Sequence, residues 1–203
     1  RGCVRKYKTP KPNSFKKRYS MPNSLDRTQS DTLWTGLTDN KGDRVYMAGI
    51  IDDCSRRAFG ELYDEMGSDM TSQTARRFFE EVGVPKKSQT DGGVEFTNLY
   101  TSLLNPRREK AARLGAYELL LQEYGVEHRI TKPRTPQHNG KIERFNQTVL
   151  KEFSSRVTDG LSLETYRRLF SEYLNYYNYE RRHSSINYLT PAAAFEKYPP
   201  LAA

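Results

Sequence analysis

The stretch TPQHNGKIERFN at residues 135–146 joins a loop rich in proline and turn formers to a helix that we expect from Lys141 to Ser155. A second stretch, TDGGVEF at residues 90–96, follows a short strand predicted over Lys87–Thr90. A third, IIDDCSR at residues 50–56, ends an apolar run rich in β-forming residues. Each of the three carries acidic side chains where an expected strand or helix begins or ends.

The segments around these motifs predict a mixed sheet covered by helices. Two apolar segments separated by turn-forming residues are typical of a β-hairpin, and later segments alternate between helical and strand patterns. The expected strands are Arg44–Ile51, Arg57–Tyr63, Lys87–Thr90 and His128–Thr131, and the expected helices are Thr71–Val82, Tyr117–Tyr124, Lys141–Ser155, Leu163–Tyr179 and Pro191–Tyr198.

Composition is consistent with one domain that has a sizeable core. The chain has 203 residues, of which 35% are hydrophobic and 29% are charged. No apolar run approaches the roughly 18 residues that cross a bilayer, so we expect a soluble protein without a membrane partner. Cys3 and Cys54 are too far apart in unlike contexts, and the three histidines too scattered, for a disulfide framework or a zinc module. These features favour the reducing cytoplasm.

The net charge of +8 is concentrated at the start of the chain. Residues 1–30 hold nine basic side chains and one acid, which accounts for the whole excess. Such a segment, rich in proline and poor in aliphatic residues, is predicted to be an extended arm. Nucleic acid is its expected partner, with Lys16, Lys17 and Arg18 among the candidate phosphate contacts. The alternative is a solvated tail or linker.

Taken in order, the three motifs closely resemble the integrase core shared by retroviral integrases and many bacterial insertion-sequence transposases. The resemblance runs from about Leu33 to Tyr198 and takes in the ending YNYERRHSSINYLTPAAAFE at residues 177–196. It implies an α/β fold, an RNase H-like mixed sheet flanked by helices. On this basis we expect a basic arm over residues 1–30, the catalytic core over 31–160 and a helical C-terminal extension over 161–203.

The resemblance also implies an active site of two aspartates and a glutamate that hold two divalent ions, Mg²⁺ or Mn²⁺. Hard oxygen ligands suit these cations, which promote phosphoryl transfer. Asp91 matches the second aspartate of the family and Glu143 its glutamate. Taken alone, Asp91 could simply begin a turn and Glu143 could be a solvated helix residue.

The first aspartate of the family pattern, W-x-x-D-x-T, has no counterpart after Trp34. Threonine follows at position 38 without an intervening acid, so the expected aspartate is predicted to be missing. Asp39 is the nearest substitute, although strand alternation puts it on the opposite face from Thr38 unless a bulge intervenes. Asp52 and Asp53 are assigned a structural role.

Basic residues around the glutamate predict a rim that contacts DNA phosphates. Surface solvation is the alternative for each residue taken singly. The candidates are Lys132, Arg134, Lys141, Arg144 and Lys151.

The predicted function is that of a transposase catalytic domain that binds element ends and target DNA as a homo-oligomer, cleaves 3′ ends and transfers strands. The resemblance implies a bacterial, nucleoid-associated protein. Two alternatives stay open: a catalytically inactive integrase-like domain that still binds DNA, favoured by the missing aspartate, and an RNase H-like nuclease acting on RNA:DNA hybrids.

Overall fold

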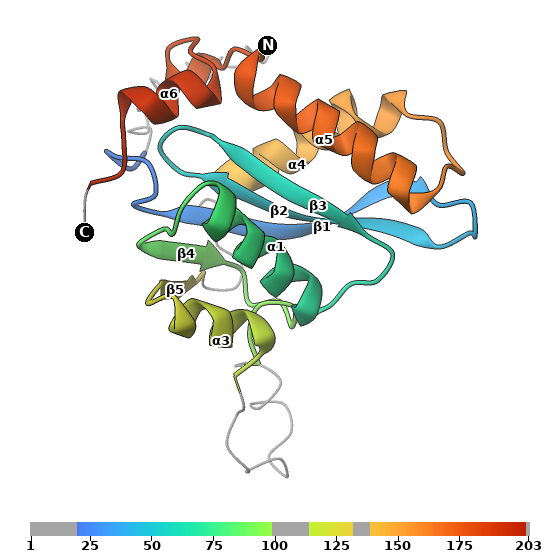
Figure 1. Ribbon diagram of the computed structural model, residues 1–203, viewed down its shortest axis with the longest axis horizontal. Coiled ribbons are helices and arrows are strands. Elements are labelled where there is room, and N and C mark those ends of the chain that lie inside the picture. Colours follow the sequence, from blue (N-terminus) through green and yellow to red (C-terminus); the bar gives the residue numbers. More distant parts are fainter. Residues whose placement is uncertain (1–19, 99–113, 132–138, 202–203) are drawn as a thin grey trace, which may run out of the picture.

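The computed structural model describes residues 20–98, 114–131 and 139–201, and Figure 1 shows their arrangement. Five strands form one sheet in the order β3-β2-β1-β4-β5. The strands β1, β2 and β3 are antiparallel, whereas β4 runs parallel to β1 and β5 parallel to β4. The predicted mixed sheet is therefore confirmed. The strands are β1 (Thr28–Thr38), β2 (Arg44–Asp52), β3 (Ala58–Tyr63), β4 (Lys87–Thr90) and β5 (Glu127–Ile130).

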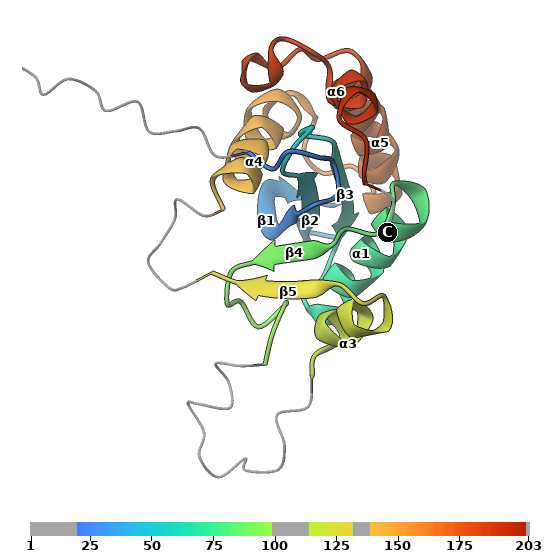
Figure 2. The same cartoon turned by 90° about the vertical axis from the view of Figure 1, so that its left-hand side faces the viewer.

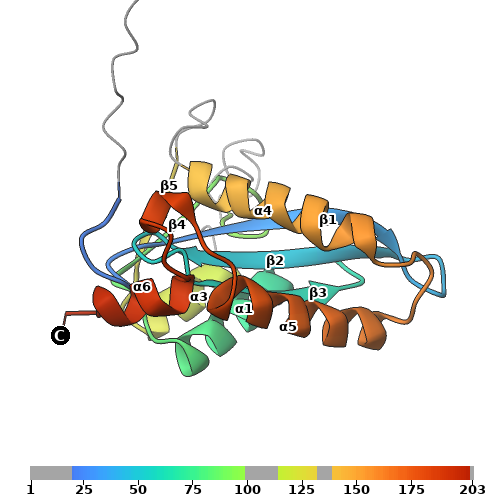
Figure 3. The same ribbon diagram turned by 90° about the horizontal axis from the view of Figure 1, so that it is seen from above.

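Helices cover both faces of this sheet, as the views in Figures 1 and 3 show. On one face lie α4 (Gly140–Glu152) and α5 (Leu163–Tyr179), and on the other α1 (Ser68–Glu81) and α3 (Ala116–Glu123). A short helix, α6 (Pro191–Lys197), ends the fold. In the described part of the chain, no helix has the length and apolar character to span a membrane.

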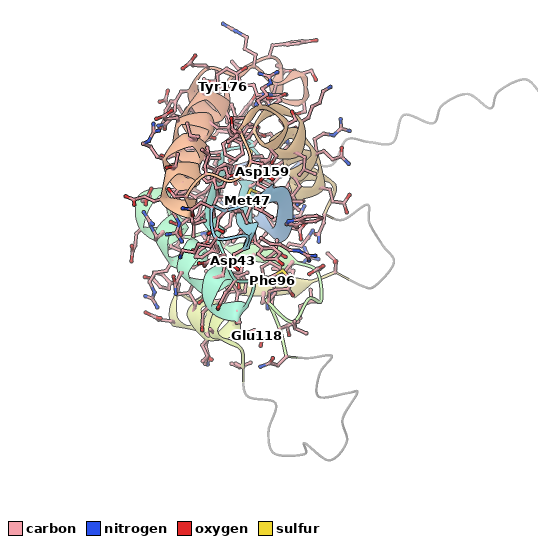
Figure 4. All side chains as sticks on the ribbon, turned by 90° about the vertical axis from the view of Figure 1, so that its right-hand side faces the viewer. Asp43, Met47, Phe96, Glu118, Asp159 and Tyr176 are labelled. Atoms are coloured by element: carbon pink, nitrogen blue, oxygen red, sulfur yellow. The ribbon has the colours of Figure 1, made fainter. Side chains whose placement is uncertain are left out.

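Two hydrophobic cores result, because neighbouring residues of a strand point to opposite faces. On β2, Met47 packs beneath α4 and α5, whereas Ile50 packs beneath α1. Figure 4 marks one buried side chain from each region, Met47 and Phe96, on opposite sides of the sheet. The sheet is thereby held between two layers of helices.

The helix α4 is fastened to the sheet by an apolar stripe. Ile142, Phe145 and Val149 follow each other at intervals of three or four residues and are buried. The ring of Phe145 meets that of Tyr177 edge to face, with 5.0 Å between the ring centroids. This packing fixes the orientation of α4 over the sheet.

The first strand corrects the predicted boundary of the basic arm. β1 begins at Thr28, and Arg27 is only 3% exposed, so the end of the segment assigned to an extended arm belongs to the folded core. Sequence pattern missed it because the strand begins with buried polar side chains, Gln29 and Ser30, instead of an apolar run. Residues 1–19, with Lys16, Lys17 and Arg18, lie outside the described residues.

We expect Phe145→Ala to destabilise the protein by about 3–5 kcal/mol, because the change removes a buried ring and leaves a cavity. Urea unfolding monitored by circular dichroism measures this. Leu150→Ala is the matched control on the same helix: its side chain is 38% exposed, and the expected loss is below about 1 kcal/mol. Equal losses in the two variants would contradict the packing described here.

Candidate active site

Two aspartates lie on neighbouring strands at the same level of the sheet. The parallel pairing of β1 with β4 aligns Thr28 with Ser88 and Gln29 with Gln89. Continued by two residues, this register puts Asp31 beside Asp91, which directly follows β4. Figure 2 shows the two strands side by side, with α4 over β1.

Strand alternation turns Asp31 toward α4. Gln29, Asp31 and Leu33 share one face of β1, and Leu33 packs in the core beneath α4. On the other face, the Ser30 hydroxyl accepts a hydrogen bond from the Tyr117 hydroxyl of α3 at 3.1 Å. The carboxylate of Asp31 thus belongs to the α4 side of the sheet.

The start of α4 is docked on the same strand by side chains of the sheet. The Gln29 side-chain oxygen accepts hydrogen bonds from the backbone N–H groups of Lys141 and Ile142, both at 3.2 Å. One strand further, the Gln89 amide donates to the side-chain oxygen of Asn139 at 3.0 Å. The two bonds to Gln29 satisfy N–H groups that a helix leaves free in its first turn. They also place Glu143, in that first turn, near the two aspartates.

A residue one turn further along α4 holds Asp31 directly. The Asn146 side-chain amide donates a hydrogen bond to Asp31 Oδ2 at 2.8 Å, and the backbone N–H of Thr32 donates to Oδ1 at 2.9 Å. Because one oxygen is bound by the helix and the other by the strand, the orientation of this carboxyl group is defined.

The pKa of Asp31 reflects its burial and the acids around it. Burial raises the pKa of Asp31 to about 7, and the carboxylates of Asp91 and Glu143 contribute to the increase. Asp91 and Glu143 themselves are exposed to solvent. Within the described residues, no three His, Cys, Asp or Glu side chains already converge closely enough to form a metal site. The donor set of three carboxylate oxygen groups fits a hard divalent cation.

The TDGGVEF loop packs a fourth acid against this group. The Thr32 hydroxyl donates to Glu95 Oε1 at 3.3 Å, and the N–H of Gly93 donates to Asp91 Oδ1 at 2.9 Å. A Cβ atom at Gly93 would lie 2.5 Å from Glu95 Oε2 and 3.0 Å from Asp91 Oδ1. A side chain at position 93 would therefore displace the Glu95 carboxylate and crowd that of Asp91.

The aspartates of the IIDDCSR motif have buried structural partners. Asp52 accepts hydrogen bonds from the backbone N–H of Leu25 at 2.8 Å and from both the N–H and the hydroxyl of Ser55 at 2.7 Å. Asp53, with no exposed surface, forms ion pairs with Arg27 of β1's leading segment and with Lys141 of α4. Asp53 therefore ties the hairpin to the start of α4.

Comparison with known proteins identifies the family of the chain. The sequence pattern of the family described as "Integrase core domain" matches residues 22–136, more than half of the chain, and a second pattern of the same description matches residues 124–191. The chain belongs to the integrase core domain family. This integrase core is 29% identical over 155 residues to the "Putative integrase ORF3" of Spiroplasma virus SpV1-C74, covering 73% of the chain and 41% of that protein.

Other relatives of the integrase core come from mobile elements. It is 30% identical over 140 residues to the "Retrovirus-related Pol polyprotein from transposon TNT 1-94" of Nicotiana tabacum, covering 66% of the chain and 9% of that protein. It is 24% identical over 191 residues to the "Transposase for insertion sequence element IS904" of Lactococcus lactis subsp. lactis (strain IL1403), covering 88% of the chain and 68% of that protein. The chain spans less than half of the first two relatives.

Solved structures show the same fold. A chain of the simian T-cell lymphotropic virus intasome, solved with PP2A regulatory subunit B56 gamma, superposes with a TM-score of 0.65 at 14% identity, covering 91% of this chain and 60% of that one. The HTLV-2 integrase catalytic core domain in complex with magnesium gives a TM-score of 0.57 at 15% identity, covering 86% of this chain and 97% of that one. The predicted RNase H-like fold is confirmed.

The integrase core brings together Asp91 and Glu143 but leaves Asp39 apart. Asp39 follows β1 eight residues beyond Asp31, roughly 25 Å along an extended strand. Its carboxylate accepts the backbone N–H groups of Lys41 and Asp43 at 2.8 and 2.9 Å, which closes the β1–β2 turn. A register shift between Trp34 and Thr38 is present, but it does not carry Asp39 to the other acids.

Asp31, and not Asp39, is the acid that lies near Asp91 and Glu143. The family pattern has its aspartate three residues after the tryptophan, whereas Asp31 precedes Trp34 by three residues. Trp34 is 51% exposed and stacks against the Arg44 guanidinium at 5.0 Å, so it does not anchor the site. In the sequence, the alternation of Gln29, Asp31 and Leu33 is the feature that indicates a shared strand face for these residues.

The predicted basic rim divides into different groups. Lys141 is directed inward to Asp53, so its charge is compensated within the fold. Arg144 is exposed near Glu143, and Lys151 is exposed in the last turn of α4, about 12 Å from Glu143 along the helix axis. Lys132 and Arg134 lie outside the described residues.

The raised pKa of Asp31 predicts that the unfolding free energy depends on pH when a chelator is present. Its pKa is raised from 3.8 to about 7, so between these values the folded state binds more protons than the unfolded state, and this contribution to stability falls as pH rises. As the pH rises from 4 to about 7, we expect the unfolding free energy of Asp31→Asn to increase relative to that of the parent chain. Above about pH 7 the difference between the two should stay constant. Urea unfolding across this range measures it, with Asp64→Asn, an exposed acid, as control. A difference that does not change with pH would contradict the assigned environment.

Removal of the Asp53 charge should unfold the hairpin–helix junction. We expect Asp53→Asn to cost about 3–5 kcal/mol of unfolding free energy, because the buried Arg27 guanidinium would keep its charge without an acid. Lys141, whose pKa burial lowers to about 7, would lose its acidic partner as well. The control Asp64→Asn should change stability by no more than about 0.5 kcal/mol. Chemical denaturation compares the two, and a small loss in Asp53→Asn would show that the ion pairs are dispensable.

Proposed function

We propose that this integrase core is the catalytic domain of a DNA transposase, with Asp31, Asp91 and Glu143 as the ligands of divalent ions. The observation that carries the proposal is the placement of the three carboxylates on one side of the sheet, where two of them raise the pKa of the third. Mutually repelling carboxylates in a partly exposed setting favour the binding of a cation. The relatives from a transposon and an insertion sequence support DNA as the substrate.

The residues of the chain have distinct roles in this proposal. Mg²⁺ or Mn²⁺, when bound by such carboxylates, supplies charge stabilisation for in-line phosphoryl displacement. Asn146 and the Thr32 N–H orient Asp31, which is the least exposed of the three acids. Asp91 and Glu143 are open to solvent, so a DNA phosphate can approach from their side. The docked first turn of α4 keeps Glu143 at a defined distance from the strands.

The proposed reaction is cleavage at the 3′ ends of the element followed by transfer of those ends to target DNA. Both steps displace one oxygen at a phosphodiester by another, water first and then a 3′-hydroxyl, so one site serves both. We propose that the chain acts as a homo-oligomer on DNA, in the cytoplasm of a bacterium. Asp31 supports the active reading over the inactive alternative, because it offers a third acid beside Asp91 and Glu143.

Single substitutions test the ligand assignment. We expect Asp31→Asn, Asp91→Asn and Glu143→Gln each to lower metal-dependent nicking of DNA by at least about 100-fold, since each removes a charged ligand. Nicking of supercoiled plasmid in Mn²⁺ or Mg²⁺, and joining of end-containing oligonucleotides, measure this.

Asp39→Asn is the discriminating control. It keeps the acids of the proposed site and should retain nicking, provided that thermal unfolding shows it to be folded. Full activity of Asp31→Asn together with inactivity of folded Asp39→Asn would overturn the assignment. Cleavage of an RNA:DNA hybrid without cleavage of DNA would favour the RNase H-like alternative.

A further inference from the structure

A basic hollow lies on the flank of α4, away from its contact with β1. Its volume is about 540 Å³, and its walls come from α4 and from the segment at residues 180–190 that joins α5 to α6. Figure 3 shows this segment beside the first turns of α4. Arg144 and Thr148, one turn apart, belong to the α4 wall together with Gly140 and Lys141, while Asn146, between them in sequence, faces Asp31 on β1. The hollow is therefore a neighbour of the carboxylate site and distinct from it.

The lining of this hollow has one sign of charge. Five basic side chains line it, and among the described residues none of the lining side chains is acidic. Hydroxyl groups complete the wall. The five are Arg56, Lys141, Arg144, Arg181 and Arg182, and the hydroxyl-bearing residues include Thr148, Ser184 and Ser185.

Some of these charges are already used by the fold, and others are available. Arg181 forms a two-pronged ion pair with Glu152, at 2.7 and 2.8 Å, while Lys141 and Arg56 both pair with Asp53, Arg56 at 3.9 Å. Within the described residues, neither Arg144 nor Arg182 forms an ion pair; the Arg182 guanidinium donates only to the Tyr188 carbonyl, at 3.3 Å. The fixed pairs build the walls, and the two remaining arginines are left to bind an anion.

An aromatic side chain stands at the rim in an unfavourable backbone conformation. Asn187 and Tyr188 are consecutive residues with positive φ, 57° and 59°. The left-handed region is costly for a residue with a large side chain and is tolerated where the surrounding structure enforces it, often at functional sites. Tyr188 lines the hollow yet is 65% exposed, so its ring is not held there by burial.

We propose that this hollow is a DNA-binding subsite, in which Arg144 and Arg182 hold a backbone phosphate and Tyr188 stacks on an adjacent base. Guanidinium groups form paired hydrogen bonds with phosphate oxygens, and exposed aromatic rings stack on bases without sequence preference. The proposal rests on the proposed function in that the chain acts on DNA. It extends the DNA contacts from the carboxylates around α4 to the segment at residues 180–190.

The position of Arg144 links the two sites. It follows Glu143 directly in the first turns of α4, so a strand bound in the hollow would pass close to the carboxylates. His183, which also lines the hollow, does not add to its charge near neutral pH, because burial and the neighbouring Arg181 lower the pKa of His183 to about 4. Arginine side chains thus supply the positive charge that is free to bind.

The first experiment measures binding of a fluorescent DNA duplex of about 30 base pairs by the full chain in EDTA, across a series of salt concentrations. We expect Arg144→Ala/Arg182→Ala to lower affinity by at least about tenfold and to reduce the salt dependence by about two ions. Arg76→Ala/Arg168→Ala is the control, because it removes the same charge from exposed helix surfaces that do not line the hollow. Its loss of DNA affinity should be clearly smaller. Equal losses in both double variants would overturn the proposal.

Tyr188 provides a test that separates binding from stability. Tyr188→Gly removes the ring and suits the left-handed backbone, so its melting temperature should equal or exceed that of the parent chain. We nevertheless expect weaker DNA binding, with Tyr188→Phe close to the parent chain because it keeps the stacking surface. Tyr179→Ala, which removes another exposed tyrosine, is the control. Parent-like binding by Tyr188→Gly would overturn the role of the ring.

The subsite and the catalytic proposal can fail separately. If the parent chain binds DNA through the hollow but nicks none with Mg²⁺ or Mn²⁺, the subsite stands and the catalytic assignment falls. If the parent chain nicks DNA and Arg144→Ala/Arg182→Ala binds and nicks like its control, the subsite falls while the carboxylate assignment stands.

Discussion

The docking of the first turn of α4 onto β1 is the contact on which the site depends. Gln29 accepts the backbone N–H groups of Lys141 and Ile142, and Asp53 binds the Lys141 side chain from the hairpin. The apolar stripe through Phe145 then holds the rest of the helix on the sheet. Because Glu143 lies within this docked turn, its distance from Asp31 and Asp91 is set by the core and not by a mobile loop.

The same constraint explains why the central strand begins with polar residues. A buried amide at Gln29 would be costly without partners, but here it serves as a cap for helix N–H groups that need acceptors. Ser30, on the opposite face, is bonded to the Tyr117 hydroxyl of α3. Side chains at the start of β1 thus form hydrogen bonds with helices on both faces of the sheet. Its polarity is a consequence of helix docking on either side.

The candidate aspartates fall into two groups: those whose negative charge is already balanced by hydrogen bonds or ion pairs within the fold, and those near Asp31. Asp39 and Asp52 accept backbone N–H groups of their own turns, and Asp53 is enclosed by basic side chains. The pKa of Asp31 is instead raised by burial and by the nearby carboxylates of Asp91 and Glu143, a group of acids whose charge a cation would neutralise. The basic hollow is the counterpart for an anion: its paired cations are structural, while Arg144 and Arg182 have no acidic partner among the described residues.

The sequence by itself determined most element types, the resemblance to integrase cores, and two members of the candidate site. Asp91 and Glu143 stand in local motifs, a strand end before two glycines and the first turn of an amphipathic helix, which are legible along the chain. Only the tertiary structure made Asp31 a candidate, because its place depends on the pairing of β1 with β4 and on Asn146 of α4, partners far away in sequence. Tertiary structure likewise decided that Lys141 turns inward while Arg144 faces the hollow, since local spacing cannot tell which side of a helix meets a buried acid.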